Sequence, residues 1–317
     1  NATTNVVVNF SSCTGDCKYF VEARVDCAAV QKFEVNAAST SLTLALNTVV
    51  GQPYEIQFRK TTESSYSDAK GVIEFAEIGL EGAEFLPEKK SLRGVGNHNC
   101  LRRHKMLVIG DSITAAYGVD GVSPCSYTAD TENEDHSYAA IVATQVQADL
   151  HVVAWSGKGV VRNYGDVNQM STEPMPTYYN RTLATLPPSP DVTGSNYWPP
   201  ESFPADIVLV MLGTNDYSTQ PQPTDEQFTS GLVDLLQRIQ VDYPQAKGQI
   251  AAMCAPMQAG NQCKNIQIAA QQVGANYIFI DPETLEGGFG CDGHPNAATQ
   301  QLMANVVGPA VMSMLKE

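Results

Sequence analysis

The sequence predicts two domains, an all-β sandwich followed by an α/β domain built on a parallel sheet. Three observations carry this prediction. At 317 residues the chain exceeds the usual size of a single core. Its first part shows short stretches in which apolar and polar residues alternate, whereas in the remainder short apolar runs alternate with helical patterns. We place the sandwich at residues 1–98 and the α/β domain at residues 99–317.

The N-terminal region has the period of two that is typical of strands with one buried face. The predicted strands include Val6–Phe10, Tyr19–Val25, Leu42–Leu46, Tyr54–Phe58 and Val72–Ile78. Short strands separated by polar turns indicate an antiparallel sandwich or jelly roll. Such a domain either binds sugar or supports the catalytic domain. Because the sequence lacks an obvious row of aromatic residues here, the supporting role is favoured.

The second region alternates between the two kinds of element, which predicts a parallel sheet with helices on both faces. The predicted strands are Met106–Ile109, His151–Trp155, Ile207–Leu212, Gln249–Cys254 and Tyr277–Ile280. The predicted helices are His136–Asp149, Asp225–Val241, Lys264–Gly274 and a final one that Asn296 caps and that ends at Met314. Thr224 and Gln227 form a capping-box pattern at the start of the second helix.

Four polar motifs fall where a predicted strand ends or a predicted helix begins. Ser112 follows the first strand, Gly157 the second and Asn215 the third, while His294 lies just before the last helix. In open parallel sheets, chemistry takes place beyond the carboxyl ends of the strands. We therefore expect these four residues to converge at one edge of the sheet.

This ordered set resembles the SGNH hydrolases, the GDSL esterase superfamily, and more closely carbohydrate esterase family 2. The similarity extends to Thr131-Glu-Asn133, to the run from Trp155 to Tyr164 and to Gly213-Thr-Asn-Asp216. It also extends to the β-sandwich placed before the hydrolase domain. The resemblance implies a secreted serine esterase that removes O-acetyl groups from plant or algal polysaccharide, with a preference for primary 6-hydroxyls of glucose or mannose units.

The residue types suit this chemistry. Serine is a weak nucleophile and needs an adjacent base, for which His294 is the best candidate among the five histidines. The resemblance assigns the oxyanion donors to the backbone N–H groups of Ser112 and Gly157 and to the side-chain amide of Asn215. Asp216 is expected to brace the loop rather than react.

The third member of a catalytic triad is left open. Asp292 lies two residues before the histidine, whereas the common SGNH pattern places the aspartate three residues before it. A shift of one residue would turn the carboxylate away from the imidazole. Either Asp292 or a main-chain oxygen is therefore expected to orient His294.

An irregular region rich in Pro, Tyr and Asn, residues 162–204, follows the second strand of the sheet. Aromatic rings stack on the apolar faces of sugars, so a wall of such rings would bind a glycan. The candidates for this substrate wall are Tyr117, Tyr178, Tyr179, Trp198 and Tyr217. The alternative for each ring is that it simply packs its loop.

The composition limits the classes of molecule that the protein is expected to bind. The formal charge is −15, and the acidic residues are scattered, which argues against nucleic acid and anionic membranes and is compatible with a neutral glycan. No apolar run is long enough to cross a bilayer, and a chain that begins Asn1-Ala-Thr is expected to be already processed. No Cys-x-x-Cys pair or histidine-rich cluster appears, so neither a metal nor another cofactor is expected.

Eight cysteines and three glycosylation sequons indicate a secreted protein that carries N-linked glycans. The sequons begin at Asn1, Asn9 and Asn180. Eight cysteines allow about 105 disulfide patterns. We expect Cys254 to pair with Cys263 across a short loop.

Two other functions remain as alternatives. A lipase or phospholipase of the same superfamily would need an apolar lid, and the sequence shows no amphipathic lid helix. A non-catalytic glycan-binding protein on a hydrolase scaffold is disfavoured because all four motif residues are present.

Overall fold

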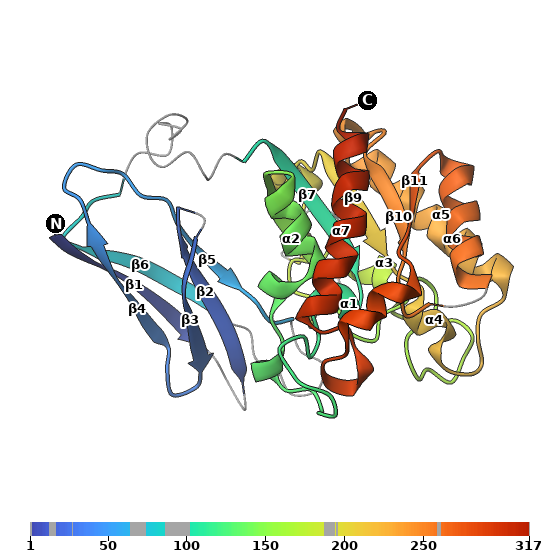
Figure 1. The fold of residues 1–317 in the computed structure, drawn as a ribbon, viewed down its shortest axis with the longest axis horizontal. Coiled ribbons are helices and arrows are strands. Elements are labelled where there is room, and N and C mark those ends of the chain that lie inside the picture. The colour runs from blue at the N-terminus through green and yellow to red at the C-terminus, as the bar shows by residue number, and fades with distance from the viewer. Residues whose placement is uncertain are drawn as a thin grey trace. The chain divides into compact units, whose positions relative to one another are not determined.

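The structure, a computed structural model, describes residues 2–12, 17–26, 28–63, 74–85, 102–186, 194, 196–258 and 261–316. The chain divides into two compact units, Asn1–Leu101 and Arg102–Glu317 (Figure 1). The first contains antiparallel strands and the second a parallel sheet with helices, as the sequence predicts.

The first unit is a β-sandwich of two three-stranded antiparallel sheets, with strand orders β4-β1-β6 and β3-β2-β5. Its strands are β1 (Ala2–Ser12), β2 (Lys18–Val25), β3 (Ala28–Asn36), β4 (Ser41–Thr48), β5 (Ile56–Lys60) and β6 (Glu74–Glu81). Val8 of one sheet and Val21 of the other are buried in the same core cluster, so the inner faces pack together. Strand β3 was not predicted, because most of its residues are exposed and the alternation is lost.

The second unit is built on a five-stranded parallel sheet with the order β11-β10-β9-β7-β8. Its strands are β7 (His104–Gly110), β8 (Ala148–Ala154), β9 (Ile207–Met211), β10 (Ile250–Cys254) and β11 (Asn276–Phe279). Its helices are α1 (Ser112–Ala115), α2 (Tyr138–Gln145), α3 (Met175–Tyr178), α4 (Thr214–Ser218), α5 (Asp225–Asp242), α6 (Asn261–Val273) and α7 (Ala297–Met314).

Helices cover both faces of this sheet and form three layers (Figure 1). Helices α2 and α7 pack on the face that Met106 and Val108 present, while α5 and α6 pack on the face of Leu107 and Ile109. Consecutive residues of β7 thus point into opposite cores, which explains why the sequence of this strand is continuously apolar.

The sequence located most elements to within a few residues. The capping box is present, since Thr224 Oγ1 accepts from the N–H of Gln227 at 3.1 Å and the Gln227 side chain accepts from the N–H of Thr224 at 2.8 Å. The predicted helix His136–Asp149 is shorter than expected. It ends at Gln145, because Gln147 takes a left-handed conformation, with φ 55°, and the chain enters β8 at Ala148.

Across the residues that are described, no helix is long and apolar enough to cross a membrane.

Candidate active site

Ser112 lies at the carboxyl end of strand β7, at the first residue of α1. The Asp111 side chain caps this helix, because its Oδ1 accepts from the N–H of Ile113 at 3.0 Å. A Cβ on Gly110 would lie 2.0 Å from Thr114 Oγ1, so only glycine permits this tight strand-to-helix turn. The turn leaves Ser112 5% exposed.

His294 is far from Ser112 in the sequence and lies in the loop before α7. Its Nε2 lies 2.8 Å from Ser112 Oγ, a hydrogen-bond distance. Burial lowers the pKa of His294 from its ordinary value of 6.5, while the backbone carbonyl of Asp292 opposes this effect. The imidazole is therefore mostly neutral at neutral pH, the form that accepts a proton from a hydroxyl.

Asp292 does not contact the imidazole through its carboxylate. Its Oδ2 accepts from Tyr117 Oη at 2.9 Å and from the N–H of Tyr127 at 2.8 Å. Asp292 has φ 49° and ψ 32°, a left-handed conformation that directs the side chain toward the loop after Ser112. Within the described residues, His294 Nδ1 is buried and meets no acceptor with hydrogen-bond geometry. Neither option that the sequence left open forms a hydrogen bond to Nδ1 in this part of the structure, although the backbone at Asp292 and Cys291 is close enough to raise the pKa of His294.

Asn215 and Gly157 lie beside the serine turn. Asn215 Nδ2 donates to the carbonyl of Lys158 at 2.8 Å and lies 3.4 Å from Asp111 Oδ2. The amide thus touches both the residue before Ser112 and the residue after Gly157. Gly157 has φ 81°, a conformation that favours glycine. The structure therefore brings the three strand-end motifs and His294 together.

The Asp216 carboxylate stabilises the loop that follows Gly157. Its Oδ1 accepts from the N–H groups of Val161 and Arg162 at 2.8 and 2.9 Å, and its Oδ2 accepts from the N–H of Val160 at 2.9 Å. Burial raises the pKa of Asp216 to about 6, although the three backbone donors favour the carboxylate. Asp216 therefore fixes the loop that carries Gly157, as the sequence suggested.

The five rings proposed as a substrate wall have different surroundings. Tyr117 is the one that meets the serine–histidine pair, with its ring 4.4 Å from that of His294. Trp198 stacks on His151 at 5.0 Å. Tyr217 packs edge-on against Phe228 at 5.1 Å.

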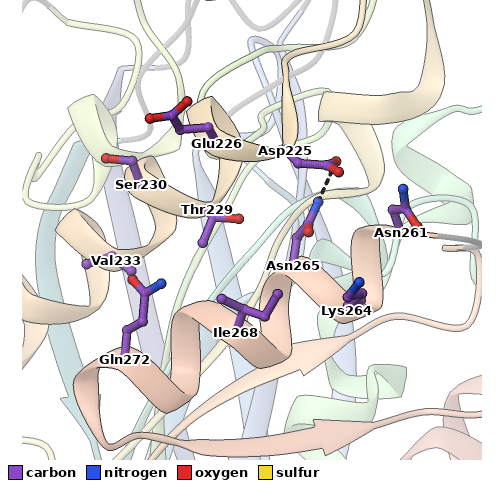
Figure 2. Close-up of a pocket in the computed structure, with 10 residues that line it drawn as sticks. All are labelled: Asp225, Glu226, Thr229, Ser230, Val233, Asn261, Lys264, Asn265, Ile268 and Gln272. Atoms are coloured by element: carbon purple, nitrogen blue, oxygen red, sulfur yellow. Dashed lines mark hydrogen bonds between the residues drawn. The ribbon is translucent and has the colours of Figure 1, made fainter.

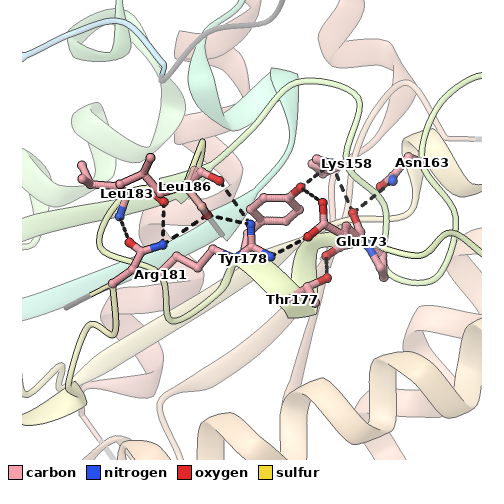
Figure 3. A network of polar contacts seen from close by, with 11 residues as sticks. Lys158, Asn163, Glu173, Thr177, Tyr178, Arg181, Leu183 and Leu186 are labelled. Atoms are coloured by element: carbon pink, nitrogen blue, oxygen red, sulfur yellow. Dashed lines mark hydrogen bonds and ion pairs between the residues drawn. The ribbon is translucent and has the colours of Figure 1, made fainter. Parts of the chain in front are cut away.

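Tyr178 and Tyr179 are buried in the core and pack their loop. The Lys158 ammonium lies over the Tyr178 ring at 4.3 Å and donates to its hydroxyl at 3.2 Å (Figure 3). That hydroxyl donates to Glu173 Oε2 at 2.9 Å, and Arg181 pairs with Glu173 Oε1 at 2.8 Å. With 6% exposure, Tyr178 belongs to a network that stabilises the loop after Gly157, and it presents little surface to a glycan.

The sequence did not predict the covalent link between the loop after Ser112 and the loop that carries His294. A disulfide joins Cys125 to Cys291, the residue before Asp292. The N–H of Cys291 donates to the carbonyl of Gly118 at 3.0 Å, and the N–H of Asp292 to that of Cys125 at 2.8 Å. The signal was the position of Cys291 beside the Asp-Gly-His motif. The predicted Cys254–Cys263 disulfide is confirmed.

A separate open groove of about 470 Å³ lies between α5 and α6 (Figure 2). Its polar wall includes Asp225 and Asn265, which are hydrogen-bonded at 2.7 Å. None of the predicted site residues is among those that line it.

With this geometry in place, comparison with known proteins identifies the family. A model of the GDSL-like lipase/acylhydrolase family matches residues 108–302, which include Ser112, Gly157, Asn215 and His294. The chain belongs to this family. The match covers the sheet from within β7 and ends inside α7.

Two curated relatives of the chain are longer proteins. The chain is 29% identical over 294 residues to the cellulase/esterase CelE of Acetivibrio thermocellus, a match that covers 89% of this chain and 33% of CelE. It is 22% identical over 247 residues to an acetylxylan esterase/glucomannan deacetylase of Cellvibrio japonicus, covering 77% of this chain and 64% of that protein. The chain thus spans less than two thirds of either relative.

Solved structures match nearly the whole chain. A family two carbohydrate esterase from Clostridium thermocellum, in complex with cellohexaose, has a TM-score of 0.76 at 25% identity, covering 99% of this chain and 90% of that one. A family 2 enzyme with a carbohydrate-binding domain from Corynascus thermopiles (Myceliophthora fergusii) has a TM-score of 0.75 at 25% identity, covering 99% and 93%. The chain therefore has the two-domain fold of family 2 carbohydrate esterases.

Proposed function

We propose that this chain is a serine esterase that removes O-acetyl groups from polysaccharide through an acyl-enzyme. The observation that carries the proposal is the 2.8 Å distance between His294 Nε2 and Ser112 Oγ in a member of the GDSL-like family. Such a pair is the minimum that an activated serine nucleophile requires.

In the first half-reaction, the Ser112 hydroxyl donates its proton to His294 Nε2 as Oγ attacks the acetyl carbonyl. The carbonyl oxygen becomes an oxyanion. His294 then protonates the departing sugar oxygen, which leaves as an alcohol and yields acetyl-serine. In the second half-reaction, water loses a proton to His294 and attacks the same carbonyl, so that acetate and the free serine are released.

We assign the oxyanion donors to the N–H groups of Ser112 and Gly157 and to the Asn215 side chain. Asn215 Nδ2 donates to the Lys158 carbonyl at 2.8 Å and to Asp111 Oδ2 at a longer 3.4 Å. We assign to the developing charge the hydrogen that makes the longer bond, which it would exchange for a bond to the oxyanion. A preorganised donor of this kind typically contributes about 10²–10³ in kcat.

The substrate class follows from the names of the relatives and from charge. CelE is named as an esterase and the Cellvibrio japonicus relative as an acetylxylan esterase and glucomannan deacetylase. The formal charge of −15 favours a neutral glycan over a polyanion. Within this class we propose acetyl groups on primary 6-hydroxyls of glucose or mannose units. Tyr117 lies beside His294, but with 8% exposure it presents little surface to a glycan.

We also propose that the chain is secreted and carries N-linked glycans. The Cys125–Cys291 and Cys254–Cys263 disulfides support an oxidising compartment. Asn9 lies in β1, where its side chain donates to Glu77 at 2.9 Å, and a glycan there would replace this bond. Asn180 follows α3, whereas Asn1 lies outside the described residues.

The test measures acetate release from acetylated glucomannan, xylan and chitin, with 4-nitrophenyl acetate as the general ester. We expect release from 4-nitrophenyl acetate and from at least one glycan, and poor activity on esters of about eight carbons or more. Ser112→Ala should abolish activity, while Ser313→Ala, at an exposed position on α7, should retain it. A strong preference for long acyl chains would instead indicate a lipase, and a wild-type chain that does not react with a fluorophosphonate would indicate a non-catalytic protein.

A further inference from the structure

Tyr117 contacts every part of the serine–histidine arrangement. Its backbone N–H donates to the Ser112 carbonyl at 3.0 Å. Its ring lies 4.4 Å from the His294 ring, at an interplanar angle of 37°. Its hydroxyl donates to Asp292 Oδ2 at 2.9 Å. The same side chain thus links the nucleophile turn, the base and the nearby carboxylate.

A second aromatic ring, that of Tyr127, also contacts Tyr117. The ring of Tyr127 stacks on it at 4.2 Å with an angle of 19°, and the N–H of Tyr127 donates to the same Asp292 oxygen at 2.8 Å. Tyr117 is 8% exposed. A ring that contacts two neighbouring rings and is hydrogen-bonded at its tip is restricted in its orientation, and it restricts the imidazole that it contacts.

The imidazole needs such support. In a full triad, a carboxylate on Nδ1 holds the ring and steadies the imidazolium. Here Asp292 is turned to the tyrosines, and Nδ1 meets no acceptor in the described structure. The face of a tyrosine within about 6 Å of a cation also attracts it, so Tyr117 favours the imidazolium that forms when Ser112 is deprotonated.

We propose that Tyr117 is a positioning residue for His294, and that Asp292 acts on the base through Tyr117 rather than through Nδ1. The inference rests on the proposed esterase function, and it deepens the account of the same site. Two substitutions of Asp292 distinguish this role from that of a triad carboxylate. Asp292→Asn keeps an oxygen that can accept both hydrogen bonds, and asparagine tolerates the left-handed backbone of this position. Asp292→Ala removes both acceptors.

The test compares Tyr117→Phe, Asp292→Asn, Asp292→Ala and the double variant Tyr117→Phe/Asp292→Ala, with 4-nitrophenyl acetate and a fluorophosphonate probe. We expect Asp292→Asn to lose less kcat than Asp292→Ala, since the bonds that fix Tyr117 persist. We expect Tyr117→Phe and Asp292→Ala each to lower kcat by about 10–100-fold with KM nearly unchanged, because the base is misplaced. The double variant should be no slower than the slower single one, as for two residues that act through one contact.

Matched controls are Tyr277→Phe in β11 and Asp234→Asn on the exposed side of α5, both outside the site. Melting temperatures check that each variant is folded. A loss of about 10⁴ in the kcat of Asp292→Asn would indicate a direct Ser–His–Asp triad and overturn the inference, since that is the effect of losing a triad carboxylate. Multiplicative losses in the double variant would overturn it too. A wild-type chain inert to both reagents would overturn the proposed function and, with it, the inference. Activity on the nitrophenyl ester but on none of the glycans would overturn the proposed substrate alone.

Discussion

His294 Nε2 lies 2.8 Å from Ser112 Oγ, although 182 positions separate the two residues in the chain. Their meeting depends on the parallel sheet, because the turn after β7 and the loop before α7 are both anchored at the same edge. Asn215 and Gly157 reach this edge from β9 and β8, the two neighbours of β7 in the sheet.

The pKa of His294 predicts the pH dependence of the reaction. Burial lowers this pKa below 6.5, and the base works when it is neutral, so activity should persist to more acidic pH than an unperturbed histidine allows. The acid limb of kcat/KM for 4-nitrophenyl acetate should have its midpoint below pH 6.5. Asp292→Asn should move the midpoint further down, since the Asp292 charge raises the histidine pKa. A midpoint above that of free histidine would contradict the assignment of His294 as the base.

Removing the Asn215 amide should affect the chemical step more than binding. Asn215→Ala is expected to lower kcat about 10²–10³-fold with a small change in KM, because the donor acts on the developing oxyanion. Steady-state kinetics with 4-nitrophenyl acetate measures both constants. Asn276→Ala is the control. Asn276 is the first residue of β11, and its side chain donates to the backbone carbonyls of Gly248 and Ile250, outside the proposed site. Equal loss of kcat in the two variants would argue for a general structural effect.

Asp216→Asn should loosen the Gly157 loop. Asparagine keeps one acceptor oxygen, so at least one of the three backbone N–H groups of residues 160–162 would face an amide donor. A buried unsatisfied group costs about 1–3 kcal/mol. For a domain of this size that is a fall in Tm of about 2–12 °C. We expect this fall in a thermal melt together with at least a tenfold loss of kcat, whereas Asp234→Asn on the exposed face of α5 should change neither.

A side chain at Gly121 should disturb the histidine loop. The Cβ of Gly121→Ala would lie 2.2 Å from Cys291 Sγ and 2.7 Å from Cys125 Sγ, so the disulfide has to move. Overpacking of this kind costs about 1–3 kcal/mol. Activity should fall by more than the loss of folded protein accounts for, because Asp292 and His294 lie one and three residues after Cys291. Gly165→Ala, at a left-handed position with no atom within 4 Å of the added Cβ, is the control for backbone strain. Full activity in Gly121→Ala would show that the disulfide tolerates displacement.

The strand-end residues could be predicted from the sequence because each follows a buried apolar run, and parallel topology then places their carboxyl ends together. The sandwich and the capping box were likewise readable from short-range patterns. The Cys254–Cys263 pair was accessible because its loop is short.

What the sequence could not provide depends on contacts between loops. The Tyr117–Asp292 bond requires the left-handed backbone of Asp292, which local propensity does not specify for an aspartate. The burial of Tyr178 and Tyr179 follows from a network with Lys158, Glu173 and the core, whereas in the sequence these rings lie in a stretch with no regular hydrophobic period. Strand β3 has few buried residues and therefore no alternation to read.

The covalent link between Cys125 and Cys291 has a practical consequence for producing this protein. Chain synthesised in a reducing bacterial cytosol would lack this bond. The loop after Ser112 and the loop that carries His294 would then be joined by hydrogen bonds alone. Yield of soluble material would then be a poor guide to specific activity, and expression in the periplasm or a yeast secretory pathway is the better choice for kinetic work.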